Sequence, residues 1–290
     1  MNKNILFVND DPLDGLGGAS ATFKAFFIPE LCDFVLTNEF NKSIAEKYKT
    51  IVFGNIFRAT SEAVDAIVSC VQSHNVYVMA FDYNFCAYRS PLLKKLNRNS
   101  STDPYSGNGV LRKLWEAFGL YAKEIFFMSE RQRKIYINTI GLGTHNTSVI
   151  SSAFHKDDWA ILYCATLAPV KKSGTWCVIS GIDDHQRFCK GTDNAIDICK
   201  ASNFKYDLIP YTTSYKDFIK TLAQYSGLVY MPNNWDTCPR VVIEARFLGL
   251  NLILNTNVQH YDESWWQGSF HDMYCYLKGR PDQFWSKITK

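Results

Sequence analysis

The chain has 290 residues, of which 47% are hydrophobic and 15% aromatic, which is enough for one large or two medium packed domains. No run approaches the ~18 consecutive apolar residues of a membrane span, and the first residues show no signal-peptide pattern. A formal net charge of +3 is too small to indicate a polyanionic partner by itself. Nine cysteines without a CxxC pair or a metal-ligand spacing predict thiols in a reducing compartment, the cytoplasm.

Short apolar runs alternate with amphipathic helical patterns in the first half of the chain. Strands are predicted at 5–8, 34–36, 50–53, 76–81 and 125–128, and helices at 19–27, 60–71 and 129–138. Residues 82–122 interrupt this rhythm as a basic insertion. Buried strands that alternate with helices are typical of a parallel sheet covered on both faces, so a doubly wound α/β domain is expected.

A second cycle of the same kind follows a polar segment at about 150–174. Its predicted strands are 176–180, 206–209, 227–231 and 250–255, and its predicted helices are 192–201, 215–223, 239–248 and 281–285. We therefore assign residues 1–155 to an N-terminal domain and residues 156–290 to a C-terminal domain. Ligands of such sheets bind at the carboxyl ends of the strands. The corresponding loops are 9–18, 82–90, 181–191 and 232–238.

The most informative stretch is Asp236-Thr-Cys-Pro-Arg-Val-Val-Ile-Glu244, between a predicted strand and a predicted helix. Pro239 suits the first helical turn, where N–H groups have no intrahelical partner. The remaining N–H groups and the positive end of the helix dipole suit a diphosphate or a sugar hydroxyl. Asp236 precedes this anion site, and Glu244 lies about two turns into the helix. The alternative is that Asp236 caps the helix and Glu244 faces solvent.

The spacing of Asp236 and Glu244 resembles the acidic pair of the group 1, retaining GT-B glycosyltransferases, in which both members are Glu. The resemblance implies two Rossmann-like domains that face each other across a cleft, with an N-terminal acceptor domain and a C-terminal nucleotide-sugar donor domain. It implies that Asp236 and nearby backbone groups hold the donor sugar, and that Glu244 accepts hydrogen bonds from the ribose. The implied donor-binding residues beside Asp236 are Thr237, Cys238, Pro239 and Arg240. A UDP-sugar is then the co-substrate, with no other cofactor, and no metal is expected because the chain lacks an Asp-x-Asp motif.

Two further loops are similar to elements of that family. Gly15-Leu-Gly-Gly18 stands between the first strand and its helix, where glycines allow positive φ and close backbone approach to a ligand. Gly17 and Gly18 are the expected donor contacts; a plain tight turn is the alternative, and a dinucleotide fingerprint would need a third spaced glycine. Lys190-Gly191 resembles the element whose Lys holds the diphosphate leaving group, and Arg187 is a second candidate cation at an unusual spacing. Such cations stabilise the charge that develops on the leaving diphosphate, whereas two solvated surface cations are the alternative.

The first half offers candidate acceptor residues. Asp82 follows a predicted strand where the family commonly has an acceptor-facing His or Asp, so we count it with Asp236 and Lys190 as catalytic; an Asp that bonds its own loop is the alternative. Cations and aromatic side chains in the insertion suit phosphates and exposed bases, although a solvated basic loop has the same composition. The expected acceptor-binding residues are Arg89, Lys94, Lys95 and Arg98. Nearby members of the same pattern are Arg112, Lys113, Tyr88, Tyr105 and Trp115.

The stretch from Asp236 to Ala245, together with Asn255-Thr-Asn-Val-Gln-His260, resembles phage-encoded glycosyltransferases. The resemblance implies a retaining, metal-independent enzyme of a host-cell cytoplasm that transfers a sugar to hydroxymethylated bases of phage DNA. A glycan or polysaccharide acceptor stays open as an alternative. So does a non-catalytic nucleotide-sugar-binding module, because Asp replaces Glu at position 236. His260 is a candidate sugar or acceptor contact, although a lone His is more often structural.

Overall fold

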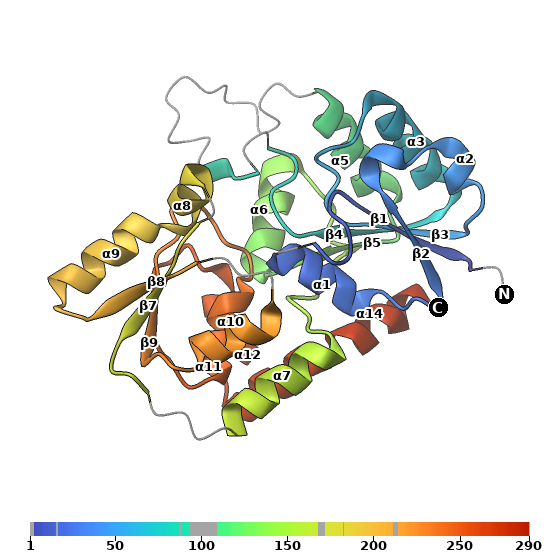
Figure 1. Ribbon diagram of the computed structural model, residues 1–290. Helices are drawn as coiled ribbons and strands as arrows, with labels where there is room; N and C mark the ends of the chain where they lie inside the picture. Colours follow the sequence, from blue (N-terminus) through green and yellow to red (C-terminus); the bar gives the residue numbers. More distant parts are fainter. Residues whose placement is uncertain are drawn as a thin grey trace. The chain divides into compact units, whose positions relative to one another are not determined.

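The computed structural model describes residues 3–15, 17–86, 89–92, 109–167, 172–181, 183–210 and 214–289. The chain divides into two units, labelled by element in Figure 1. Unit 1 comprises Met1–Ala153 and Tyr276–Lys290, and unit 2 comprises Phe154–Cys275. None of the helices in these described ranges is long and apolar enough to cross a bilayer.

Unit 1 is built on a six-stranded parallel sheet of order β2-β1-β3-β4-β5-β6. The centre of this sheet is formed by the apolar runs from which strands were predicted. They are apolar throughout because a strand covered by helices on both faces buries every side chain. The strands are β1 (Ile5–Asn9), β2 (Cys32–Leu36), β3 (Thr50–Phe53), β4 (Asn75–Ala80), β5 (Glu124–Phe127) and β6 (Thr147–Val149).

Two of the longer helices of unit 1, α3 and α6, begin after a capping hydroxyl. Thr60 accepts a hydrogen bond from the Ala63 N–H (3.1 Å), and Ser129 accepts one from the Gln132 N–H (3.1 Å), as expected of N-cap hydroxyls. The helical elements are α1 (Gly18–Phe26), the 3₁₀ helix η1 (Thr37–Glu39), α2 (Lys42–Ala45), α3 (Ser61–Ser73), α5 (Gly109–Tyr121), α6 (Glu130–Ile140) and α14 (Arg280–Ile288).

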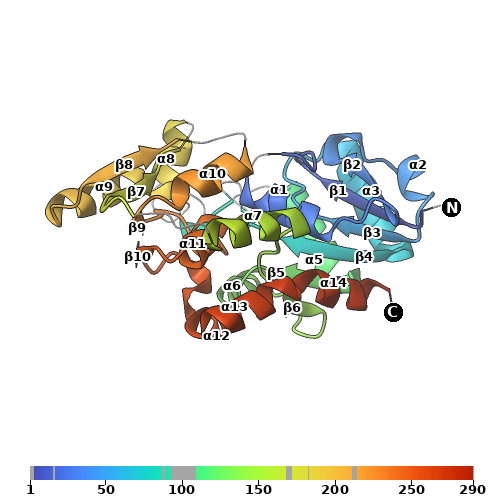
Figure 2. The same ribbon diagram turned by 60° about the horizontal axis from the view of Figure 1, so that its bottom comes forward.

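The C-terminal helix α14 belongs to unit 1, so the assignment of 276–290 to the second domain was wrong. Its apolar face explains the placement. Phe284 is fully buried with its ring 4.7 Å from that of Phe26, and the Trp285 indole N–H donates to the Phe26 carbonyl (3.1 Å). Helix α14 packs against α1, as Figure 1 shows, and Figure 2 gives the same two helices from a second direction.

Helix α5 (Gly109–Tyr121) lies inside the range 82–122, so the prediction of a basic insertion across that whole range was also wrong. The helix packs its apolar face on α3, and Trp115 is buried in the core. Arg112 and Lys113 both form ion pairs with carboxylates of the same unit. Trp115 is therefore unavailable to stack on a base, and the two cations lie on the solvent side of a core helix.

Unit 2 is built on a four-stranded parallel sheet of order β10-β9-β7-β8. The strands are β7 (Trp176–Ile179), β8 (Tyr206–Ile209), β9 (Gly227–Tyr230) and β10 (Asn251–Leu254). The helical elements are α7 (Lys156–Leu167), α8 (Asp184–Lys190), α9 (Thr192–Ala201), α10 (Tyr215–Leu222), α11 (Arg240–Phe247), η2 (Gln259–Asp262), α12 (Ser264–Gln267) and α13 (Phe270–Lys278), whose last residues belong to unit 1. Val178 and Val229 from the sheet pack with Ala195 and Cys199 from α9 in its core.

Candidate functional site

Three loops of unit 2 meet at the carboxyl edge of its sheet, where they follow the neighbouring strands β7, β9 and β10. The Asn233 backbone N–H and side-chain amide donate to carbonyls at the end of α8, at 3.2 and 2.9 Å. The side-chain amides of Asn255 and Asn257 both donate to the Pro232 carbonyl, at 2.9 and 2.8 Å. The predicted ligand loops 181–191 and 232–238 are therefore held together, and the loop after β10 joins them.

Gly191 fixes how closely two of these loops approach. It separates α8 from α9 and has a φ of +64°, a conformation that favours glycine. A Cβ atom at this position would lie 1.7 Å from the Met231 carbonyl oxygen, which is backbone and has no rotamer to change. Only glycine satisfies both conditions, so Lys190 and Gly191 lie directly against the end of β9.

Lys190, Asp236 and Tyr230 form a hydrogen-bonded cluster at this edge. The Lys190 Nζ lies 3.0 Å from the Asp236 Oδ2, and the Tyr230 hydroxyl donates to the same oxygen at 2.5 Å. The Lys190 side chain is 42% exposed and that of Asp236 is 19% exposed, whereas Tyr230 is buried. The cluster thus presents a cation to solvent and keeps its carboxylate behind it.

The neighbours of Lys190 set its charge state. Burial lowers the pKa of the Lys190 ammonium, but the Asp236 carboxylate and the Tyr230 hydroxyl outweigh that effect and hold the pKa well above its usual range. Burial, and then the charge of Asp236, raise the pKa of the Tyr230 phenol. Lys190 is therefore a cation and Tyr230 a neutral donor at neutral pH. A cation at the ends of parallel strands can bind an anionic ligand or stabilise a departing anion.

Arg240 and Glu244, on α11, form a buried ion cluster instead of facing solvent. They are only 5% and 3% exposed, and the Arg240 Nε lies 3.4 Å from the Glu244 Oε1. The Arg240 guanidinium also bonds Asp158 (2.8 Å) and lies 4.1 Å from the centre of the Phe154 ring. Burial raises the pKa of Glu244, and the charge of Arg240 opposes that rise. The alternative of a solvent-facing Glu244 is wrong, and its contact with a ribose stays a prediction.

The other residues expected on the donor side lie near helix ends, Thr237 to Pro239 before α11 and Arg187 in the last turn of α8. Pro239, not Asp236, is the N-cap residue of α11, and Thr237 and Cys238 before it are buried. Arg187 bonds Asp193 through two nitrogens, at 2.5 and 3.1 Å, so its guanidinium is held by α9. The roles of these residues toward a donor stay predictions.

The glycine loop of unit 1 has the backbone that the sequence predicts. Gly17 precedes the first residue of α1, Gly18, and has a φ of +137°, with open space where a Cβ would stand. This conformation needs glycine and leaves the start of α1 uncovered by a side chain at that point. Whether Gly17 and Gly18 contact a donor stays a prediction.

At the carboxyl edge of the unit 1 sheet, Asp82 forms an ion pair with Arg89. The structure thus joins a predicted catalytic residue to a predicted acceptor-binding residue. The charge of Asp82 raises the pKa of Arg89, and the Asp82 carbonyl accepts a hydrogen bond from the Tyr136 hydroxyl (2.6 Å). The predicted acceptor residues Lys94, Lys95 and Arg98, with Tyr88 and Tyr105, lie outside the described residues.

In unit 2, His260 is fully buried near the cluster of Lys190, Asp236 and Tyr230. The Asp236 N–H donates to the Asn257 carbonyl, and the Gln259 N–H donates to the Asp236 carbonyl, both at 2.9 Å, so the loop that carries His260 is bonded to Asp236. The His260 ring packs on Trp265 and Trp266, at 5.5 and 4.6 Å between ring centres. Neither ring nitrogen has a hydrogen-bond partner among the described residues. Burial, opposed by Asp236, lowers the pKa of His260 from 6.5 to about 3.

The low pKa of His260 predicts a loss of stability in mild acid. Above pH 6.5 neither the folded nor the unfolded chain protonates this ring. As the pH falls from 6.5 toward about 3, the His260 ring binds a proton in the unfolded chain but not in the folded chain. The free energy of unfolding then falls by roughly 1 kcal/mol per pH unit. Urea unfolding at pH 7 and pH 5 should show a smaller acid loss in His260→Phe than in the wild type. The exposed His145→Gln is the matched control, and an equal acid loss in all three proteins would contradict the prediction.

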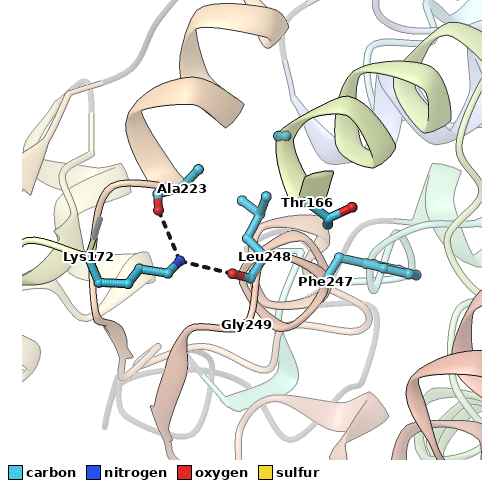
Figure 3. A pocket seen from close by; sticks show the side chains of 7 residues that line it. Thr166, Lys172, Ala223, Phe247, Leu248 and Gly249 are labelled. Atoms are coloured by element: carbon cyan, nitrogen blue, oxygen red, sulfur yellow. Dashed lines mark hydrogen bonds between the residues drawn. The ribbon is translucent and has the colours of Figure 1, made fainter. Parts of the chain in front are cut away.

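A cavity of about 310 Å³, shown in Figure 3, lies at the amino edge of the unit 2 sheet, opposite the carboxyl edge that carries Lys190 and Asp236. The Lys172 ammonium donates to the carbonyls of Ala223 and Leu248, both at 2.9 Å, which are the C-cap residues of α10 and α11. Burial lowers the pKa of Lys172. A cation that binds two helix C-termini is a structural bridge, so this cavity is not the candidate site.

Sequence reasoning missed Tyr230, which is buried at the end of β9. The available signal was its position, since the last residue of a parallel strand lies at the ligand edge. No group of three or more His, Cys, Asp or Glu side chains in the described part of the chain is placed to hold a metal ion.

No family model and no curated protein matches the sequence. Solved structures match its fold. Anabaena HepE in complex with UDP aligns with a TM-score of 0.55 at 12% identity, over 86% of this chain and 80% of HepE. HepE in complex with UDP-glucose aligns with a TM-score of 0.53 at 11% identity, over 98% and 95%. An α-glucosyltransferase in complex with UDP-glucose and DNA containing an abasic site aligns with a TM-score of 0.45 at 10% identity, over 98% and 94%. The chain has an α/β fold with parallel sheets that is structurally similar to the fold of HepE.

Proposed function

We propose that the chain is a glycosyltransferase that takes its sugar from a UDP-sugar. The observation that carries the proposal is the Lys190–Asp236 pair at the carboxyl edge of the unit 2 sheet, where three loops meet. Lys190 ends α8 and directly precedes Gly191, the N-cap residue of α9, and a cation beside a helix N-terminus suits a diphosphate. The fold likeness to HepE, a protein solved with UDP and with UDP-glucose, supports the choice of donor.

In this proposal each residue has a separate task. Lys190 binds the diphosphate and stabilises the charge that develops when the sugar leaves. Asp236 accepts hydrogen bonds from the sugar, and the start of α11 lies beside it. Glu244 accepts hydrogen bonds from the ribose and so orients it, while Arg240 holds the Glu244 carboxylate in place. The sugar keeps its anomeric configuration, as in the family whose motif this chain resembles.

For the acceptor we propose hydroxymethylated bases in DNA. In unit 1, the Asp82 carboxylate accepts a hydrogen bond from the acceptor hydroxyl, and Arg89 orients Asp82 through their ion pair. The basic residues Lys94, Lys95 and Arg98 would bind the DNA backbone. A glycan acceptor and binding without turnover are the competing outcomes that an experiment must separate.

The test has a donor arm and an acceptor arm. In the donor arm, UDP binding and the hydrolysis of UDP-sugars are measured without any acceptor; binding without hydrolysis or transfer would indicate a non-catalytic module. In the acceptor arm, radiolabelled sugar is offered to hydroxymethylated DNA, unmodified DNA and neutral glycans. Transfer to the first only, falling steeply as salt rises because phosphate contacts release counterions, supports the proposal. Salt-insensitive transfer to a glycan would replace DNA as the acceptor. The anomeric configuration of the product, read by NMR, tests retention.

A further inference from the structure

The Asp236 carboxylate is held on one oxygen only. Lys190 and Tyr230 both bond the Oδ2 atom, and no described residue bonds Oδ1. The two donors differ in kind. One is a charged ammonium on a flexible stem, and the other is a neutral phenol on a ring that is 1% exposed.

We propose that Tyr230 is the positioning residue that keeps Asp236 in place while Lys190 moves from Asp236 to the diphosphate of the donor. This inference rests on the proposed function, because it needs an anionic donor that competes for Lys190. It adds a residue and a sequence of bonds that the proposed function does not contain.

Exposure decides which bond opens. The Lys190 side chain is the accessible member of the pair, so an incoming diphosphate meets the ammonium before it meets the carboxylate. A diphosphate carries more negative charge than one carboxylate and offers several oxygens, so it competes well for the ammonium. The Lys190 Nζ lies only 5.7 Å from the centre of the Tyr230 ring, whose π face stays attractive to the cation as it moves.

Tyr230 cannot follow Lys190. Its backbone pairs in register with Leu254 of β10, and its ring is packed in the interior of unit 2. When Lys190 leaves, the hydroxyl of Tyr230 is the remaining side-chain donor to Asp236 among the described residues. His260 nearby does not replace it, because that ring is neutral and makes no hydrogen bond there. One rigid donor then sets the direction in which the Oδ1 atom faces the sugar.

The test is Tyr230→Phe, which removes one oxygen and keeps the ring. Loss of a hydrogen bond to a charged group changes a rate or an equilibrium constant by a factor of roughly 10 to 100. We therefore expect kcat for UDP-sugar hydrolysis or transfer to fall by that factor. KM for the UDP-sugar and the affinity for UDP should change less than about threefold, because Lys190 still binds the diphosphate. Tyr206→Phe, on the edge strand β8 of the same sheet, is the matched control and should behave as the wild type.

A double-mutant cycle separates positioning from a general structural role. If Tyr230 acts through Asp236, Tyr230→Phe should change kcat less than about twofold in an Asp236→Asn background, whereas independent effects multiply. If the turnover of Asp236→Asn is too low to measure, the single variant Tyr230→Phe decides the question. A lower kcat with an unchanged KM supports positioning, and a raised KM with an unchanged kcat contradicts it. Wild-type kcat in Tyr230→Phe, or equal losses in both backgrounds, would overturn the inference. A wild-type protein that neither binds UDP nor turns over any UDP-sugar would instead overturn the proposed function.

Discussion

Lys190→Ala is expected to lower kcat by about 10²-fold or more, because one preorganised charge at a leaving group is worth several kcal/mol. The ammonium is more accessible than its partner Asp236, so most of its contribution should go to the ligand. The cost in folding stability should be small, since ion pairs that are partly exposed contribute about 1 kcal/mol or less. Steady-state kinetics with UDP-sugars, together with thermal unfolding, measures both effects.

Two variants make the Lys190 experiment specific. Lys220→Ala removes an exposed cation from α10 of the same unit and should keep wild-type turnover. Lys190→Arg keeps the charge but changes its shape, so it should recover part of the lost rate. A folded Lys190→Ala protein with near-normal turnover would remove Lys190 from the leaving-group role.

The sequence pattern predicted most of the fold because both units are alternating strands and helices with strong local signals. Strands 50–53 and 206–209 and helix 192–201 were predicted to the residue and are confirmed as β3, β8 and α9. Helix α7 was missed because its apolar residues are spread around its circumference, so no single face signals a helix. Helix α5 was missed because its segment was interpreted from its cations as a basic loop, although the buried residues of the helix recur at helical spacing.

The candidate site was predictable in part, because loops that follow neighbouring parallel strands must end at one edge. That rule is enough to expect Lys190 and Asp236 in the same region, and the structure places them 3.0 Å apart. The choice of partners was not predictable. Arg240 bonds Glu244 four residues away and also Asp158, which is distant in sequence, and only the packing of α7 on α11 makes that contact. The same holds for Arg187, whose guanidinium is held by Asp193.

Gly191→Ala is expected to have the largest effect on the architecture of the site. The new Cβ would meet the Met231 carbonyl, so the backbone of one loop must move away from the other. Strain at positive φ and an overpacked contact each cost about 1–3 kcal/mol, so the free energy of unfolding should fall by roughly 2–6 kcal/mol. Because Lys190 is the preceding residue, the shift should also separate it from Asp236 and lower turnover at temperatures where the protein is still folded.

Gly249→Ala isolates the contribution of the close approach. Gly249 also has a positive φ, +68°, but no atom lies within 4 Å of its hypothetical Cβ. This control therefore has the backbone strain without the collision and should lose only about 1–3 kcal/mol, the cost of the strain. Chemical unfolding of both variants gives the difference in stability, and kinetics at a temperature below both transitions gives the difference in turnover. If the two variants lose the same stability and the same turnover, then the approach of Gly191 to Met231 does not hold the site together.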